Sequence, residues 1–333
     1  MSELRPELRR FVEKRFPGAA VERLAGDASY RIFYRISPRS AASVVLMDYG
    51  SPFEVETDDV RLGRVFRRAG LRVAELIELS PEIGILVLED LGSSSLESVL
   101  RDSRRPASSS PPPELRRAVD LAAQVADRGT AALADSDRAA GPALDRERFR
   151  FEMDFFLEHF VGGLVGKPNL AQGLRDPLYG LADRAAECPR PVLCHRDFHS
   201  RNLMVLGNGS LAMVDIQDAR WGPDTYDLAS IVCDAYLEID DAWVDTLVDR
   251  YLGALESRPE PAAFRCRFGL VAGQRMIKAL GSFGWLTTVK RTDRYLEAIP
   301  RTLGRIDRLL GSVDETRALR RLLAESDLLR IRP

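Results

Sequence analysis

The N-terminal part of the chain, up to residue 92, combines helical and strand-like patterns of apolar positions. Within residues 2–16, Leu4, Leu8, Phe11 and Val12 recur at helical spacing, which predicts a short charged helix. A second helix is expected over 54–69. Three β-branched or aromatic runs bounded by Gly, Pro, Ser and Asp are predicted strands: 30–36, 43–48 and 83–89. We therefore expect a small sheet with one inserted helix.

From residue 114 onward the pattern becomes mostly helical. Helices are expected over 115–134, 146–160, 226–238, 241–256, 261–281, 293–310 and 314–327. One helical stripe is interpreted as core rather than a cofactor contact: Phe149, Met153, Phe156, Leu157 and Phe160. The Ser/Pro-rich segment 103–113 cannot pack well and is a predicted mobile loop. The fold class is thus α+β, with a small lobe at 1–92 and a larger, mostly helical lobe at 93–333.

Composition narrows the class of protein. The 333 residues are 45% hydrophobic and 29% charged, as in ordinary soluble domains, and the net charge is −2. This balance predicts no nucleic-acid partner, and no apolar run is long enough to predict a membrane span. The charged first ten residues lack the apolar segment of a signal peptide. The four cysteines form no C-x-x-C pair, so we expect buried, reduced thiols, no structural zinc and a cytoplasmic location.

The candidate chemistry lies between residues 195 and 219. Two short apolar runs, 203–206 and 211–214, flank an Asn-Gly turn and predict a β-hairpin. Closing that hairpin sets Asn202 and Asp215 opposite each other, and both carry the hard oxygen ligands that suit Mg²⁺. Asp197 lies five residues before Asn202. The spacing matches the kinase catalytic loop H-R-D-x-x-x-x-N with a metal-binding Asp downstream.

His195-Arg196-Asp197 with Asn202, followed by Asp215, resembles the aminoglycoside phosphotransferase/choline kinase-like family, which shares the protein-kinase fold. A narrower resemblance is to the anomeric sugar kinases of cell-wall recycling, which phosphorylate N-acetylmuramate and N-acetylglucosamine at the 1-position. It rests on the sequences GDASYR (26–31), VLMD (45–48), IQDA (216–219), and KALG (278–281) with Tyr295.

The resemblance implies a bilobal protein-kinase-like fold that uses ATP and Mg²⁺. It implies that Asp197 is catalytic and that Asn202 and Asp215 hold the metal on the phosphates. The segment Leu88-Glu89-Asp90-Leu91-Gly92 is similar to the family's hinge, so Glu89 and Leu91 would receive adenine through their backbone groups. Ser29 and Arg31 would contact the nucleotide, and His195 and Asp227 would support the catalytic loop.

One departure from the general kinase pattern concerns the grip on the phosphates. Met47 stands where the phosphate-binding Lys is expected, and the segment 26–29 replaces the usual Gly-rich loop. Arg31 or Arg35 could substitute, or both could be ordinary exposed strand residues. Glu54 or Glu56, the usual helix partners of that Lys, would then have another partner or be solvated.

The acceptor is expected to be a small molecule, and the resemblance favours an amino sugar. Arg275 and Lys278 lie one helical turn apart, which suits the carboxylate of a sugar acid but is also typical of a solvated face. Asp218 could be a second metal contact or a surface turn residue, and His199 is expected to hold the loop. Two alternatives stay open: an aminoglycoside, choline or homoserine kinase, and a catalytically silent nucleotide-binding module. The oligomeric state is left open.

Overall fold

The computed structural model describes residues 4–24, 31–53, 56–102, 110–133 and 143–331. Two compact units make up the chain. The first comprises Met1–Ser94 with Met204–Gln217, and the second Ser95–Leu203 with Asp218–Pro333. The predicted division was 1–92 and 93–333, whereas residues 93–94 and the hairpin segment 204–217 group with the first unit. The predicted loop residues 103–109, and the predicted nucleotide contact Ser29, lie outside the described residues.

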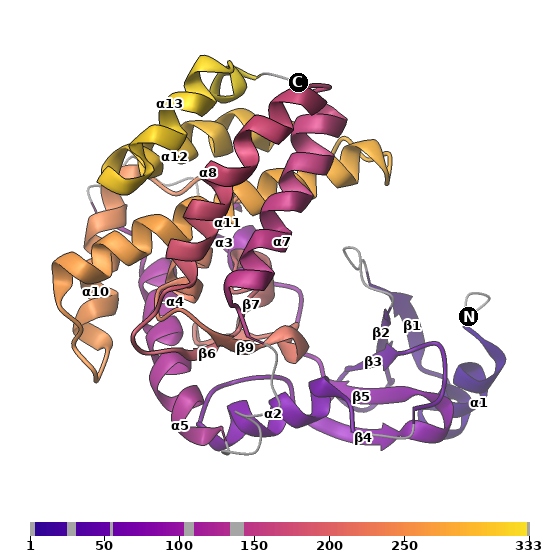
Figure 1. Cartoon of the computed structure of the whole chain (residues 1–333). Helices are drawn as coiled ribbons and strands as arrows, with labels where there is room; N and C mark the ends of the chain where they lie inside the picture. The colour runs from indigo at the N-terminus through magenta and orange to yellow at the C-terminus, as the bar shows by residue number, and fades with distance from the viewer. Residues whose placement is uncertain (1–3, 25–30, 54–55, 103–109, 134–142, 332–333) are drawn as a thin grey trace. The chain divides into compact units, whose positions relative to one another are not determined.

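The first unit contains an antiparallel five-stranded sheet, in the order β1-β2-β3-β5-β4 (Figure 1). Two of its strands, β1 and β4, were not predicted because they are edge strands with many exposed residues and lack an apolar run. The elements are α1 (Pro6–Arg15), β1 (Ala20–Arg23), β2 (Ile32–Ser37), β3 (Val44–Asp48), α2 (Asp58–Arg68), β4 (Leu76–Ser80) and β5 (Ile85–Glu89).

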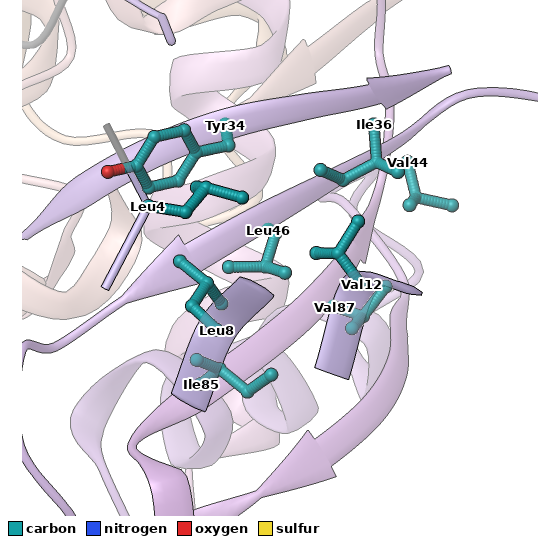
Figure 2. Close-up of a cluster of buried hydrophobic side chains, with 9 residues drawn as sticks. All are labelled: Leu4, Leu8, Val12, Tyr34, Ile36, Val44, Leu46, Ile85 and Val87. Atoms are coloured by element: carbon teal, nitrogen blue, oxygen red, sulfur yellow. The ribbon is translucent and has the colours of Figure 1, made fainter. Parts of the chain in front are cut away.

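Helix α1 covers one face of this sheet (Figure 2). Its predicted apolar face is confirmed, since Leu8 and Val12 are buried against Leu46 and Val87. Each such side chain contributes roughly 1.5–3 kcal/mol when fully buried. The sheet thereby gains a rigid core beneath the strands that carry the polar residues described below.

The second unit is mostly helical, which with the first unit's sheet confirms the α+β class (Figure 1). Its strands β6 (Val192–Cys194) and β9 (Arg220–Gly222) pair antiparallel. The predicted hairpin is present as β7 (Leu203–Val205) and β8 (Leu211–Met213). The helices are α3 (Leu96–Asp102), α4 (Pro113–Gln124), α5 (Thr130–Ala132), α7 (Arg146–Phe156), α8 (Pro168–Ala186), α9 (Tyr226–Val232), α10 (Val244–Ala254), α11 (Pro261–Thr288), α12 (Ile299–Ser312) and α13 (Arg317–Glu325).

Some helix bounds differ from the prediction for local reasons. Helix α8 was missed because Pro177, Gly173 and Gly180 interrupt its pattern. Helix α9 ends at Val232 rather than 238, where the Asp234 carboxylate accepts the backbone N–H of Tyr236. The stripe on α7 and the following π-helical turn is buried as predicted: Phe149, Met153, Phe156, Leu157 and Phe160.

The four cysteines are all free. Cys194 and Cys233 are buried as expected, whereas Cys188 and Cys266 are only half-buried. Among the described residues, no helix combines the length and apolar character that crossing a membrane requires.

Candidate active site

The segment from His195 to Asn202 connects β6 to β7 in the second unit, and its backbone is pinned by buried acids. The Asp227 carboxylate on α9 accepts the backbone N–H groups of His195 and Arg196, over 2.6 and 3.1 Å. The Asp234 carboxylate accepts that of Ser200 over 2.8 Å. Asp227 was anticipated from the family resemblance. Asp234 was missed because it lies inside the predicted helix 226–238, where an acid gives no signal of its own.

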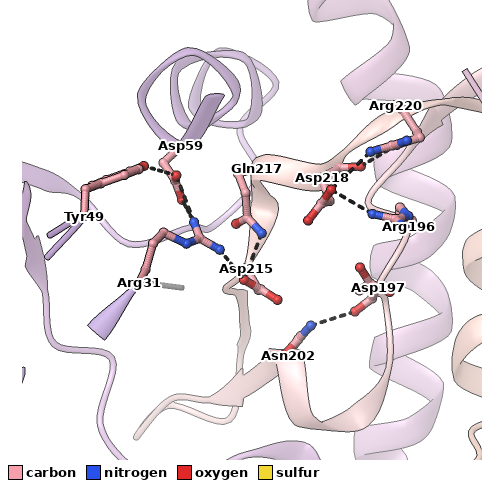
Figure 3. Close-up of polar contacts among 10 residues, drawn as sticks. All are labelled: Arg31, Tyr49, Asp59, Arg196, Asp197, Asn202, Asp215, Gln217, Asp218 and Arg220. Carbon is pink, nitrogen blue, oxygen red and sulfur yellow. Dashed lines mark hydrogen bonds and ion pairs between the residues drawn. The ribbon is translucent and has the colours of Figure 1, made fainter. Parts of the chain in front are cut away.

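Arg196 holds the turn immediately before Asp197. Its φ is +78°, a left-handed conformation that costs a non-glycine residue on the order of 1–3 kcal/mol. The two hydrogen bonds of Asp227 stabilise this turn, and the Arg196 guanidinium is paired with Asp218 at 2.7 Å. Arg220 also donates to Asp218, over 3.1 Å (Figure 3). Asp218 therefore acts in a local ion-pair network beside the loop.

Asn202 is fixed at the other end of the same loop. Its Nδ2 donates to the backbone carbonyl of Asp197 over 3.0 Å (Figure 3). Because the nitrogen of the Asn202 amide makes this contact, the side-chain carbonyl oxygen is the atom that can face a ligand. The loop thus presents a carboxylate and an amide oxygen in one fixed arrangement.

The charge state of Asp197 is set by the cations around it. Burial raises the pKa of its carboxyl, but the positive charges of Lys278, Arg196 and Arg275 outweigh burial and hold the pKa well below its ordinary range. Asp197 is therefore ionised at physiological pH. It can accept a hydrogen bond from a hydroxyl group and can receive its proton.

The two predicted basic residues of α11 have different contacts. Arg275 donates from Nη1 to the Arg196 carbonyl over 3.2 Å, and its guanidinium lies 4.2 Å from the Tyr226 ring centroid. Lys278 lies 3.6 Å from the buried carboxylate of Glu152. Arg275 is consequently bound to the loop backbone rather than solvated.

Glu152 is an acid in the middle of the core helix α7, and sequence reasoning missed it. Its Oε2 accepts a hydrogen bond from Gln274 over 2.8 Å, and its side chain is 3% exposed. A single Glu in an amphipathic helix ordinarily points to solvent. Only the packing of α7 against α11 makes it the counter-charge of Lys278.

The histidines of the loop are packed rather than exposed. His195 is fully buried, with its ring edge-on to Phe198 at 5.8 Å between centroids. His199 contacts Tyr236 in the same way at 5.0 Å. Burial lowers the pKa of His199, which favours the neutral ring. Both contacts suit a role in holding the loop.

Asp215 follows β8 in the first unit and also has a left-handed backbone, with φ +61°. Its Oδ1 accepts hydrogen bonds from Arg31 over 3.1 Å and from Gln217 over 3.0 Å. The side chain is 42% exposed. Asp215 is thus held by one oxygen while the carboxylate stays accessible.

The predicted hinge follows β5 in the same unit. The Glu89 side chain is paired with Arg72, and the Glu89 backbone N–H donates to the Glu75 carbonyl over 2.9 Å. Asp90 accepts hydrogen bonds from Arg35 at 2.7 and 3.0 Å and from the Ser43 hydroxyl at 2.7 Å. These contacts lower the pKa of Asp90 to about 2, the Arg35 hydrogen bond contributing most. The predicted hinge is therefore fixed by ion pairs with Arg72 and Arg35, and Leu91 beside it is half-buried.

The donor chemistry of these residues fits Mg²⁺. Asn202 offers an amide oxygen because its Nδ2 is engaged by Asp197, and Asp215 offers a carboxylate. Both are hard oxygen ligands, which Mg²⁺ prefers, and Mg²⁺ commonly takes only one or two ligands from the protein when it binds phosphates.

Comparison with known proteins finds one matching family and several similar proteins. Residues 20–264 match the phosphotransferase enzyme family. An N-acetylmuramate/N-acetylglucosamine kinase of Neisseria meningitidis is 31% identical over 90% of this chain and 89% of its own. The enzyme of the same name from Pseudomonas putida is 27% identical over 93% and 89%.

Solved structures show the same fold. A Plasmodium vivax ethanolamine kinase aligns with a TM-score of 0.62 and 14% identity over 90% of this chain and 85% of its own. A spectinomycin phosphotransferase, solved with ADP and spectinomycin, aligns with a TM-score of 0.58 and 10% identity over 92% and 94%. These likenesses confirm the fold expected from the resemblance.

Proposed function

The chain belongs to the phosphotransferase enzyme family, and we propose that it transfers the γ-phosphoryl group of ATP to the anomeric hydroxyl of N-acetylmuramate or N-acetylglucosamine. Phosphoryl transfer is supported most by the catalytic loop, in which Asp197 follows a left-handed residue pinned by Asp227. The choice of acceptor is supported by relatives of that name, which are 26–31% identical over most of this chain.

Asp197 acts on the acceptor in this proposal. Its ionised carboxylate accepts a hydrogen bond from the sugar hydroxyl and turns the oxygen toward the γ-phosphorus. The new oxygen–phosphorus bond forms as the bond between the γ-phosphorus and the β–γ bridging oxygen breaks, ADP leaves, and the hydroxyl proton passes to Asp197. A carboxylate with a low pKa suffices, because phosphoryl transfer depends mainly on positioning and charge stabilisation.

Nucleotide and metal are assigned to separate groups. We infer that Asn202 gives its amide oxygen and Asp215 its carboxylate to Mg²⁺, which neutralises charge on the phosphates when bound. Adenine would meet the backbone of Glu89 and Leu91, since the Glu89 side chain is held by Arg72. Ser29 stays a predicted nucleotide contact.

The basic residues of α11 favour an acceptor with a carboxylate. Lys278 carries a positive charge that acts on Asp197, and it is held by Glu152 rather than by an exposed partner. We propose that Lys278 meets the carboxylate of N-acetylmuramate. Arg275 would contribute mainly by holding the loop, because its guanidinium donates to Arg196.

A substrate panel tests this function. MgATP is incubated with N-acetylmuramate, N-acetylglucosamine, kanamycin, choline or homoserine, and ADP release is measured for the natural enzyme and for Asp197→Asn prepared in parallel. ADP release with the two amino sugars only, lost in Asp197→Asn, supports the proposal. ADP release only with kanamycin, choline or homoserine would show that the acceptor is one of these compounds and not an amino sugar. ATP binding without release on any acceptor would indicate a silent nucleotide-binding module.

A further inference from the structure

The strand position that usually carries a phosphate-binding lysine is apolar in this protein. Met47 on β3 is 5% exposed and packs in a small cluster with Val60 of α2 and Leu86 of β5. A side chain in that environment cannot donate a hydrogen bond or neutralise a phosphate. If the enzyme binds ATP, another positively charged side chain must contact the phosphates in place of the lysine.

Arg31, directly before the neighbouring strand β2, brings a cation to this end of the sheet. Its side chain is 5% exposed. Nη1 donates to both carboxylate oxygens of Asp59, over 2.7 and 2.9 Å, and Nη2 donates to Oδ1 of Asp215 over 3.1 Å (Figure 3). A buried arginine placed between two acids is oriented before any ligand arrives.

Asp59 sits in the first turn of α2, the helix inserted in the sheet unit. Its carboxylate also accepts a hydrogen bond from the hydroxyl of Tyr49 (Figure 3). Of the two acids expected from the kinase pattern, Glu56 is paired with Arg64, and Glu54 lies outside the described residues. The second candidate cation, Arg35, is committed to Asp90 and to the carbonyl of Gly92.

We propose that Arg31 replaces the missing phosphate-binding lysine and that Asp59 replaces the helix glutamate that positions such a lysine. This inference rests on the proposed use of ATP. In kinases the lysine on the third strand is held by an acid on the inserted helix and contacts the phosphates. Here the acid is still on the inserted helix, but the cation lies beside β2 instead of on the third strand, β3.

The two arms of the guanidinium have different parts in this arrangement. Nη1 anchors the side chain on Asp59, while Nη2 contacts the same Asp215 that is assigned to Mg²⁺. With Mg²⁺ bound to Asp215, Nη2 would be the group that donates to a phosphate oxygen. A guanidinium donates in a planar fork that matches phosphate geometry, so it can serve as well as an ammonium group. Asp59 is then a positioning residue.

Binding of MgATP compared with binding of adenosine tests this assignment. Arg31→Lys and the double variant Arg31→Met/Asp59→Asn are measured by calorimetry, with Glu56→Gln as the matched control. The double variant removes both charges together, which avoids leaving a buried carboxylate unpaired. We expect MgATP affinity to fall roughly 10- to 100-fold in the double variant and less in Arg31→Lys, whereas adenosine affinity is unchanged. Glu56→Gln should match the natural enzyme for both ligands.

Two outcomes would overturn the assignment. MgATP affinity within threefold of the natural enzyme in the double variant would show that Arg31 does not grip phosphate. An equal loss for MgATP and adenosine would show a general structural defect instead. The proposed function is judged separately: an enzyme that phosphorylates neither amino sugar, yet loses MgATP affinity selectively in these variants, would keep this inference and lose the acceptor assignment.

Discussion

The carboxylate of Asp227 accepts the backbone N–H of Arg196 over 3.1 Å, where Arg196 has a φ of +78°. This contact fixes the direction in which the chain enters Asp197. The carboxylate is buried, and burial raises its pKa against the opposing hydrogen bonds and charge of His195. The loop is therefore preorganised by the fold, which is how positioned groups contribute to rate without moving during the reaction.

Asp197→Asn should nearly abolish turnover while leaving MgATP binding intact. Asn cannot take up the acceptor's proton, and a general base is worth about 10²–10⁴-fold in rate. The kcat is measured by ADP release and the affinity by calorimetry. A variant that keeps more than about a third of the natural kcat, far above the loss expected for a base, would contradict the assignment.

Asp215→Ala should lose the dependence of nucleotide binding on Mg²⁺. Its carboxylate is the accessible oxygen donor beside Arg31, and without it the metal has one protein ligand fewer. ATP affinity is titrated with and without Mg²⁺. Gln217→Ala is the matched control, because Gln217 also contacts Asp215 but is not assigned to the metal. Unchanged strengthening of ATP binding by Mg²⁺ in Asp215→Ala would refute the metal assignment.

Lys278→Gln should discriminate between acidic and neutral sugars. Removing a charge-assisted contact worth about 1.5–3 kcal/mol lowers kcat/KM for N-acetylmuramate by roughly 10- to 100-fold more than for N-acetylglucosamine. Arg275→Gln should lower both values by a similar factor, since Arg275 supports the Arg196 carbonyl. Equal losses for both sugars in Lys278→Gln would remove Lys278 from the acceptor site.

Asp90→Asn should destabilise the protein at neutral pH but not in strong acid. The Asp90 pKa of about 2 is below its usual 3.8, so its ionised form stabilises the folded state above about pH 4. This contribution is lost as the pH falls toward 2. After allowing for screening by solvent, we expect the free energy of unfolding of the variant to be about 1–2 kcal/mol lower than that of the natural protein at pH 7. This difference should shrink as the pH falls toward 2.

The control for Asp90→Asn is Asp314→Asn. Asp314 is paired with Arg317 but its side chain is 81% exposed, so the unfolding free energy should change little. Denaturant unfolding at several pH values gives both comparisons. A difference between Asp90→Asn and the natural protein that stays constant from pH 7 down to pH 2 would contradict the linkage.

Local patterns predicted much of this protein. The helical faces around Leu8 and Phe149, the hairpin, and the spacing of Asp197, Asn202 and Asp215 all depend on residues close in sequence. The family resemblance carried by those spacings is confirmed by the match over 20–264.

Contacts between distant residues could not be predicted in this way. Arg31 meets Asp59 across 28 positions and Asp215 across 184. Sequence reasoning considered Arg31 as a substitute for the lysine but did not find Asp59, because an acid inside the predicted helix 54–69 gives no sign of a partner 28 positions away. The contacts of Glu152 with Lys278 and of Asp234 with Ser200 were missed for the same reason, because packing alone defines them.

The identity of the product tests the central claim most directly. N-acetylmuramate and MgATP are incubated with the enzyme, and the product is examined by mass spectrometry and phosphorus NMR together with an assay for the reducing end. We predict one ADP per phosphorylated sugar, with the phosphate on the anomeric oxygen and the reducing end lost. Phosphate on any other hydroxyl, or an unchanged sugar under conditions where the enzyme phosphorylates another acceptor, would contradict it.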